Sequence, residues 1–310
     1  MASKVPVIVF SEESTGPRTK SWMRACDEIV QALEHHGCFI AEYEGFRPEL
    51  RDPIFGVAKE LFDLPHETKV RSPDSSYSKG YIPHYPGTPL LEGLNFDGAE
   101  KLDACEKFTA LMWPSGNARF CKAAYSYASA IAKLEKLVTR MVFEGYGAGK
   151  YCDSHTESTA YVLRFLKYKK PGEDGGNAYQ IAHTDKTFLS ILHQNNVRGL
   201  EVMTKDGEWV TFEPSPSSFM VMAGDACMGW SNGRIKACYH KVDVQEERLV
   251  RYSVGFFSYN TGKIEIPKEL IDQDHPQQFK SFSHLDFLRF YHKIDGHTKL
   301  QSQIKVYCGV

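Results

Sequence analysis

Near residue 158 the spacing of the apolar residues changes from the 3.6-residue period of a helix to the two-residue period of a strand. Beyond that point the apolar runs are short, and Gly, Pro, Asn and Asp separate them. The pattern predicts strands at residues 160–168, 178–182, 188–194, 199–203, 208–212, 218–223, 236–244 and 249–259. Short strands with tight turns and no helices between them favour an antiparallel barrel or jelly roll over a parallel sheet.

The first half of the chain shows the helical period instead. Strands are expected only at 5–10 and 38–41, whereas apolar residues recur at helical spacing in 22–33, 50–62 and 120–141. Residues 72–93 have no clear period and are predicted to form a loop, and the tail 276–294 is again helical. We therefore expect a mainly β protein. A helical N-terminal layer (1–150) would cover a double-stranded β-helix, or jelly-roll, core (151–275), and a C-terminal helical tail (276–310) would pack on that core.

Composition excludes several classes of protein. Lys and Arg total 37 against 39 Asp and Glu, so the chain has no basic excess for a nucleic acid partner. No apolar run approaches the length of a spanning helix, so we expect no membrane association. The eight cysteines are scattered and no secretion signal opens the chain, which favours reduced thiols. We expect a monomer in the cytoplasm that acts on a small molecule.

Several common catalytic motifs are missing from the sequence, among them the P-loop, G-x-S-x-G and H-E-x-x-H. The glycine-rich segment 145–149 ends a predicted helix instead of following a strand. It therefore indicates a helix cap and not a dinucleotide-binding loop.

Two His-x-Asp pairs are more informative. His183 and Asp185 fall at the end of a predicted strand, where residues two apart point to the same side and can bind one ion. His284 and Asp286 fall on a predicted helix, where residues two apart diverge. The first pair is the candidate metal site, and the second is expected to be a chance match.

A third ligand is available in His240, on the predicted strand 236–244. Two histidines and one carboxylate that leave three coordination positions open are the ligand set of non-haem Fe(II) oxygenases. A structural zinc site remains an alternative, because Cys238 shares the face of His240, although such sites prefer four protein ligands and usually thiolates.

Eleven residues beyond His240, Arg251 and Ser253 lie in an otherwise apolar strand. A buried guanidinium needs an anion, and it can form two parallel hydrogen bonds with a carboxylate while Ser253 adds a third. The partner is either a protein Asp or Glu, or a small dicarboxylate bound beside the metal.

Taken together, His183-Thr184-Asp185, His240 and Arg251-x-Ser253 resemble the signature of plant 2-oxoglutarate/Fe(II)-dependent dioxygenases. Further similar elements lie outside this signature: Val5-Pro6-Val7-Ile8, Gly37-Cys38-Phe39, Phe62-x-Leu64-Pro65-x-Glu67-x-Lys69 and Ser231-Asn232-Gly233-Arg234. The stretches 183–194 and 199–202 are similar to the subgroup of glucosinolate-side-chain dioxygenases, auxin oxidases and steroidal-alkaloid hydroxylases. The chain departs from the family at Leu166, where Asn is usual, and at residues 42–45, where Asn-His-Gly is missing.

This resemblance implies that His183, Asp185 and His240 bind Fe(II), and that Arg251, Ser253 and Tyr168 bind 2-oxoglutarate. O₂ would be the other cosubstrate and ascorbate a candidate reductant. The implied reaction oxidises, most simply by hydroxylation, a hydrophobic plant specialised metabolite or hormone while 2-oxoglutarate is decarboxylated to succinate. Two alternatives stay open: a non-haem iron oxidase of the same fold that consumes no 2-oxoglutarate, and a catalytically silent small-molecule binding protein.

Aromatic and apolar residues near these motifs are candidate walls of a substrate pocket: Tyr81, Leu163, Phe188, Phe287 and Tyr291. Each of them could equally pack between the helical layer and the barrel. His84 and His193 could contact a substrate carboxylate, but a structural role is the stronger expectation for both.

Overall fold

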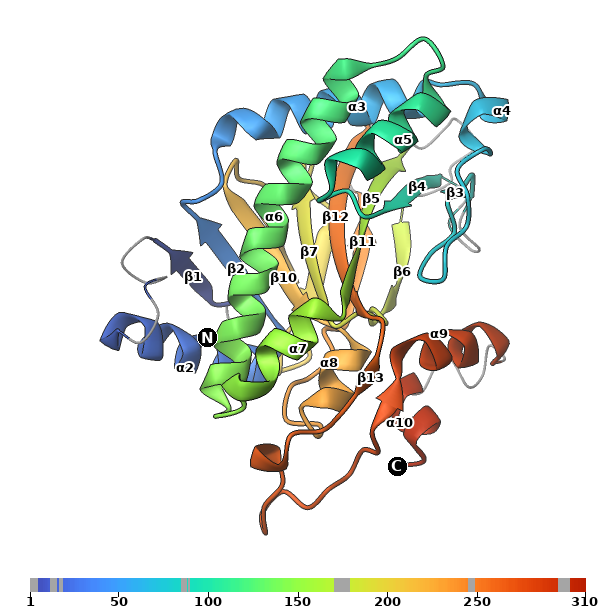
Figure 1. The fold of residues 1–310 in the computed structure, drawn as a ribbon. Helices are drawn as coiled ribbons and strands as arrows, with labels where there is room; N and C mark the ends of the chain where they lie inside the picture. The colour runs from blue at the N-terminus through green and yellow to red at the C-terminus, as the bar shows by residue number, and fades with distance from the viewer. Residues whose placement is uncertain are drawn as a thin grey trace.

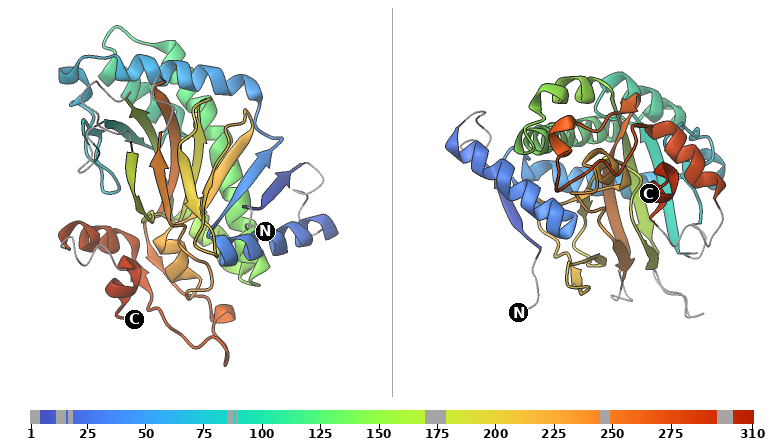
Figure 2. Two further views of the ribbon diagram at one scale, coloured as in Figure 1. Left: turned by 180° about the vertical axis from the view of Figure 1, so that it is seen from behind. Right: turned by 90° about the horizontal axis from the view of Figure 1, so that it is seen from below.

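The structure is a computed structural model that describes residues 5–11, 16, 19–84, 88, 90–169, 179–244, 249–294 and 302–310. A large twisted sheet runs through the molecule, and the long helix α6 (Ala118–Gly145) crosses one of its faces (Figures 1 and 2). A smaller sheet lies against the other face, and the two sheets enclose a hydrophobic cluster. The chain is therefore a jelly roll with a helical layer on one side, as the strand pattern predicted.

The major sheet has the strand order β1-β2-β10-β7-β12-β5-β4-β3, and only the β1–β2 pair is parallel. Half of these strands come from the N-terminal third of the chain. Their bounds are β1 (Val7–Phe10), β2 (Cys38–Tyr43), β3 (Tyr81–Ile82), β4 (Leu91–Asp97), β5 (Thr159–Tyr168), β7 (Leu189–Gln194), β10 (Ser218–Ala223) and β12 (Arg251–Asn260).

The minor sheet has the order β6-β11-β8-β9, formed by β6 (Tyr179–His183), β11 (His240–Asp243), β8 (Leu200–Met203) and β9 (Trp209–Thr211). A separate two-stranded ribbon pairs β13 (Lys263–Ile264) with β14 (Phe282–Ser283) near the C-terminus.

The helices begin and end where local chemistry satisfies their free backbone groups. The Thr19 side chain accepts a hydrogen bond from the backbone of Trp22 at the start of α2 (Lys20–His36), and Gly37, with φ of 71°, ends that helix in the left-handed conformation. The other helices are α3 (Arg51–Phe62), α4 (His66–Lys69), α5 (Leu102–Met112), α7 (Cys152–Glu157), α8 (Asp225–Trp230), α9 (His284–Lys293) and α10 (Gln303–Cys308), with 3₁₀ turns at Pro48–Leu50, Gly149–Tyr151 and Lys268–Leu270. Within the described ranges, none of the helices combines the length and apolar composition needed to cross a membrane.

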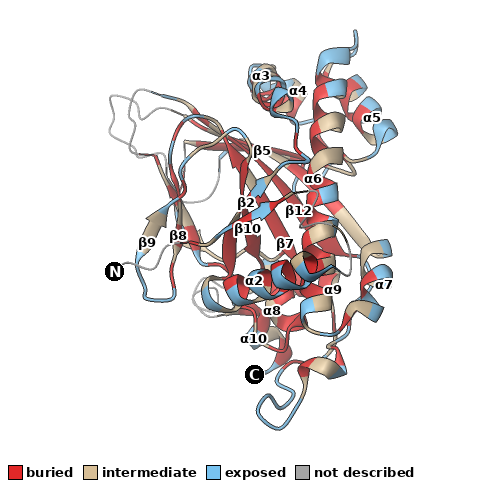
Figure 3. Cartoon of the chain, turned by 90° about the vertical axis from the view of Figure 1, so that its left-hand side faces the viewer, coloured by how far each residue is buried: buried red, intermediate tan, exposed pale blue. Residues whose placement is uncertain are grey.

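Buried residues follow the sheets and the inward sides of the helices (Figure 3). The larger hydrophobic cluster lies between the helices and the major sheet and joins Phe39, Leu163 and Phe282, one from each of the three segments expected from the sequence. One core therefore runs through all three segments, and the division of the chain into three parts stays a prediction.

Several local expectations differ from the structure. The expected loop 72–93 contains β3 and the start of β4, whose residues are buried on both faces and so show no alternation. The expected strand 236–244 begins only at His240, and the helices α4, α5, α7, α8 and α10 were not predicted. The helix in the tail begins at His284 instead of near residue 276. The segment 145–149 is a helix end, as expected, with α6 finishing at Gly145.

Candidate metal centre and active site

The two histidines of the predicted metal site come from paired strands of the minor sheet. His183 is the last residue of β6, His240 is the first residue of β11, and the two are direct partners in the antiparallel register. Asp185 lies beyond the end of β6 and not on the strand itself, which corrects the expected reason for its placement. One potential ligand atom from each of the three side chains lies within 4.8 Å of the other two.

Hydrogen bonds to the backbone orient both imidazole rings. The Nδ1 atom of His183 lies 2.8 Å from the Ile181 carbonyl oxygen, and the Nδ1 atom of His240 lies 3.2 Å from the Cys238 carbonyl oxygen. A proton on Nδ1 that is donated to a carbonyl leaves Nε2 with a free lone pair. Both rings therefore present Nε2 as the metal ligand.

The carboxylate of Asp185 is oriented in the same way. The hydroxyl of Ser190 donates to Oδ2 of Asp185 at 2.6 Å, and Oδ1 lies 3.7 Å from Nε2 of His183. Burial acts to raise the pKa of Asp185, but His240, His183 and the Ser190 hydroxyl outweigh it and hold the pKa well below its usual range. Burial lowers the pKa of His240 to about 4. At neutral pH the site therefore offers a carboxylate and a neutral buried imidazole, the protonation states that metal binding requires.

Cys238 does not join this cluster. Among the described residues, no fourth His, Cys, Asp or Glu completes a metal site with the triad. A hydrogen bond with Cys38, together with burial, raises the pKa of the Cys238 thiol well above its usual range, so the thiol stays protonated. The donor set of two imidazoles and one carboxylate fits a facial iron triad and not a closed zinc site.

Arg251 lies beside the triad with only 1% of its surface exposed. Its guanidinium donates to Oε1 of Gln194 at 2.9 Å and to Oγ of Ser253 at 3.5 Å, and it lies 4.7 Å from the ring centre of Tyr168. Its Nε atom is buried without a hydrogen-bond partner in the described part of the chain. Burial leaves the charged form of Arg251 poorly solvated and so lowers its pKa.

No described acidic side chain forms an ion pair with Arg251, so the structure does not support a protein carboxylate as its partner. The guanidinium and the metal triad instead line one cavity between the two sheets, together with Arg164, Leu166, Tyr168, Leu192, Leu200, Val242, Ser253 and Phe257. The register explains the convergence, because Arg251 pairs with Tyr168 and Ser253 pairs with Leu166 across β12 and β5.

Sequence reasoning missed Arg164, which lines this cavity, and Gln194, which accepts a hydrogen bond from Arg251. Arg164 lies on β5 four residues before Tyr168, so both side chains point into the cavity. Its Nε donates to Oδ1 of Asn95 at 2.9 Å, and its guanidinium lies 4.5 Å from the ring centre of Phe257. The two-residue period counted from Tyr168 would have found it.

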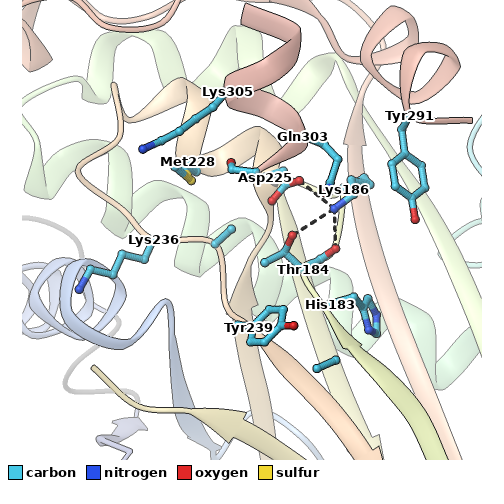
Figure 4. A pocket seen from close by; sticks show the side chains of 13 residues that line it. His183, Thr184, Lys186, Asp225, Met228, Lys236, Tyr239, Tyr291, Gln303 and Lys305 are labelled. Carbon is cyan, nitrogen blue, oxygen red and sulfur yellow. Dashed lines mark hydrogen bonds and ion pairs between the residues drawn. The ribbon is translucent and has the colours of Figure 1, made fainter. Parts of the chain in front are cut away.

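A second, wider pocket of about 450 Å³ adjoins the metal site (Figure 4). His183 lines both cavities, so the wider pocket borders the triad. Tyr291, Tyr239 and Met228 form part of its wall, and Lys186, Lys236 and Lys305 bring positive charge to it. Its size is within the range of sites that hold small metabolites.

Of the expected substrate contacts, only Tyr291 lines either of these cavities. Leu163 points to the helical side of β5, Phe188 packs on Phe143 and Trp230, and Phe287 belongs to the same core. The Tyr81 hydroxyl donates to Glu92 at 2.7 Å in the outer part of the major sheet. The structure therefore places these four residues in packing positions.

The second His-x-Asp pair has a structural role. His284 accepts a hydrogen bond from the Asn260 backbone on Nδ1 at 3.0 Å, and its Nε2 lies 2.7 Å from the Lys186 carbonyl oxygen. Asp286 faces solvent and pairs with Arg289. The two side chains diverge, as their helical spacing predicted.

His193 is buried in the core and lines neither of the two cavities. Its ring lies between 4.7 and 6.1 Å from the ring centres of Phe46, Phe55, Tyr127 and Phe219. Burial lowers its pKa to about 3, whereas the unfolded chain has the ordinary value of 6.5. The stability that this neutral ring supplies is complete above pH 6.5 and is lost as the pH falls towards 3.

We expect His193→Phe to reduce the loss of stability in acid. Each pH unit below 6.5 costs the wild type ~1.4 kcal/mol through this group, so the variant should lose about 2 kcal/mol less between pH 7.5 and 5.0. Urea unfolding at the two pH values measures the difference, and the other buried histidines cancel because both proteins contain them. Equal losses in the two proteins would show that His193 is protonated in the folded state.

A jelly roll that holds two histidines and one carboxylate beside a buried arginine defines a non-haem iron oxygenase. Residues 159–259 match the family model of the 2OG-Fe(II) oxygenase superfamily, and residues 5–121 match the model of the non-haem dioxygenase N-terminal region in morphine synthesis. A probable 2-oxoglutarate-dependent dioxygenase of Arabidopsis thaliana is 37% identical over 295 residues, which cover 93% of this chain and 96% of that protein. The chain belongs to the 2-oxoglutarate/Fe(II)-dependent dioxygenase family.

Solved structures agree with this assignment. The dioxygenase for auxin oxidation from Arabidopsis thaliana, in complex with 2-oxoglutarate, superposes with a TM-score of 0.78 at 29% identity and covers 88% of this chain and 100% of its own. The dioxygenase for auxin oxidation from rice has a TM-score of 0.78 at 26% identity, with 96% and 98% covered. The protein is thus an oxidoreductase that uses Fe(II), held by His183, Asp185 and His240, with 2-oxoglutarate.

Proposed function

We propose that the protein hydroxylates a small plant metabolite or hormone in the wider pocket, with 2-oxoglutarate held by Arg251, Ser253 and Tyr168. The observation that carries this proposal is the buried Arg251, which shares a cavity with the triad and has no acidic protein partner in the described ranges. When bound, the iron would supply the site at which O₂ oxidises the C–H bond, and 2-oxoglutarate, as it becomes succinate and CO₂, would supply two of the four electrons that O₂ accepts. The relatives named for auxin oxidation support a substrate of hormone size.

The chain's own residues bind and orient the reactants. The guanidinium of Arg251 and the hydroxyl of Ser253 would form hydrogen bonds with one carboxylate of 2-oxoglutarate. Ser190 and the two backbone carbonyls fix the ligand atoms of the triad. The wall of apolar residues around the inner cavity, among them Leu166, Leu192 and Leu200, excludes water from it.

The experiment is anaerobic absorption spectroscopy with Fe(II) and then 2-oxoglutarate. A weak visible band on addition of 2-oxoglutarate indicates chelation at the metal, and succinate formation in air confirms turnover. Iron binding without the band would favour the oxidase alternative that uses no 2-oxoglutarate. No iron binding would favour the silent binding protein.

The wider pocket favours a substrate that carries a negative charge in addition to the hydrophobic body expected from the sequence. Lys236 and Lys305 line it, whereas Asp225, the one acidic side chain among the described residues of its wall, is already paired with Lys186. Figure 4 shows Lys236 and Lys305 on the opposite side of the pocket from Tyr291. An acid with an aromatic or apolar body would place its charge near the lysines and its body against the tyrosines.

We expect a panel of aryl and alkyl carboxylates to stimulate succinate formation more than the matching amides do. For the best acid, the double change Lys236→Ala with Lys305→Ala should raise KM about 10-fold at unchanged kcat. Lys133→Ala, a change at an exposed lysine in a different surface pocket, is the control. Better turnover of the amides, or an unchanged KM in the double variant, would contradict an acidic substrate.

We also propose that the protein is a monomer in the cytosol. All eight cysteines are free thiols in the structure, which suits a reducing compartment. Size-exclusion chromatography with light scattering, and cell fractionation, test the two statements separately.

A further inference from the structure

The segment that carries Asp185 lies outside the β-sheet, so tertiary contacts and not strand pairing hold it in place. β6 ends at His183, so Thr184, Asp185 and Lys186 have no strand partner. The start of α8 supplies a backbone hydrogen bond in place of a neighbouring strand, since the backbone amide of Asp225 donates to the Asp185 carbonyl oxygen at 2.8 Å. The position of the metal ligand therefore depends on how this segment is fastened to α8.

A buried ion pair strengthens this fastening. The ammonium of Lys186 lies 2.8 Å from Oδ2 of Asp225, and the two side chains are only 10% and 1% exposed. The same ammonium donates to the carbonyl oxygen of Thr184 at 2.7 Å and to its hydroxyl at 3.1 Å (Figure 4). All three N–H groups of the Lys186 ammonium are thus used. One bonds to α8, and two bond to Thr184, the residue between the metal ligands His183 and Asp185.

Energy alone does not explain such a pair. A buried ion pair gains little net stability, because desolvation of the two charges offsets their attraction, and its best-attested use is to specify one conformation. Here the conformation specified is that of Thr184, whose carbonyl precedes the Asp185 amide. A rotation of that peptide would turn the Asp185 carboxylate away from His183 and His240.

We propose that Lys186 is a positioning residue for the metal: through Asp225 and Thr184 it holds the Asp185 carboxylate in the facial arrangement. The proposal rests on the iron triad and not on the identity of the substrate. The backbone hydrogen bond from Asp225 to Asp185 and the contact of His284 with the Lys186 carbonyl remain when the lysine side chain is removed. The segment should therefore fold without the ammonium but hold Asp185 less firmly.

The test measures metal binding without turnover. Lys186→Met keeps the length of the side chain and removes the ammonium. We expect its affinity for Co(II), measured by anaerobic calorimetry, to fall 10- to 100-fold, as for other residues that orient metal ligands. We also expect the visible bands of bound Co(II) to shift, because they report the coordination geometry.

A second buried pair supplies the control. The ammonium of Lys69 lies 2.6 Å from Glu92, with side chains 8% and 4% exposed, and it also donates to the Phe62 carbonyl at 2.8 Å. Neither residue lines the two cavities at the triad. Lys69→Met should therefore lose stability as Lys186→Met does, but bind Co(II) with the wild-type affinity and spectrum.

Asp225→Asn removes the charge of the other partner in the pair and keeps the shape of the side chain. It should also weaken Co(II) binding, and it tests the proposal if Lys186→Met does not fold. The wild-type affinity and spectrum in either folded variant would overturn the proposal. An equal loss of affinity in Lys69→Met would overturn it too, since the effect would then be one of general stability.

Discussion

His240→Ala should abolish Fe(II) binding at micromolar concentrations and with it all turnover. His240 is one of three ligands, is 4% exposed, and has its Nε2 directed to the metal by the bond between Nδ1 and the Cys238 carbonyl. Its removal leaves one imidazole and one carboxylate, and the loss in affinity should exceed the ~100-fold seen when only an orienting residue is changed. Anaerobic titration with Fe(II) measures the affinity, and circular dichroism shows that the variant is folded.

The second His-x-Asp pair supplies the matched control for that prediction. Asp286→Asn changes the carboxylate of an identical motif, at an exposed position on α9. Iron binding and turnover should stay at the wild-type level. Iron bound with full affinity by His240→Ala, or lost in Asp286→Asn, would show that the triad is wrongly assigned.

Arg251→Met should lose 2-oxoglutarate binding while the protein without cosubstrate becomes no less stable. Two charge-assisted hydrogen bonds of about 1.5–3 kcal/mol each correspond to a rise of ~10²–10⁴-fold in the apparent dissociation constant. The same charge is buried without an acidic partner in the described structure, so its replacement by an apolar side chain removes a desolvation cost. The two effects have opposite signs, which separates a binding role from a structural one.

Three measurements test this prediction together. The 2-oxoglutarate dependence of succinate formation should show the loss of affinity, Fe(II) binding without 2-oxoglutarate should be unchanged, and thermal unfolding of the free protein should show an equal or higher Tm. Ser253→Ala removes one neutral hydrogen bond and should weaken 2-oxoglutarate binding only about 10-fold. A destabilised Arg251→Met protein that binds 2-oxoglutarate normally would assign the arginine to the fold.

The metal site could be found from the sequence because its signals are local. His183 and Asp185 are two residues apart, and the apolar period around His240 placed it on a strand of the same barrel. The structure brings these three residues together as expected, but not for the stated reason, because Asp185 lies beyond the strand end. The motif specifies which residues meet, whereas the contacts of Ser190 and Asp225 decide how Asp185 is held.

The substrate positions were harder to predict because a side chain in a sheet faces one of two sides. Leu163 and Arg164 are neighbours on β5, yet Leu163 packs under the helices while Arg164 lines the cavity. Phe188 and Phe287 are apolar residues near the motifs, but both are buried in the hydrophobic core. Apolar character predicts burial and does not distinguish a core from a pocket wall.

The sequence by itself determined the class of fold, the iron ligands and the arginine beside them, because periodicity and motif spacing are properties of short segments. Only the tertiary structure decided that β4 joins the major sheet beside β5, that Arg251 has no acidic partner in the described ranges, and that Lys186 joins α8 to the metal segment. The sheet and the ion pair depend on contacts between residues far apart in the chain: Leu91 on β4 lies opposite Tyr168 on β5, and Lys186 meets Asp225. Such contacts follow from how the layers pack, which no local pattern records.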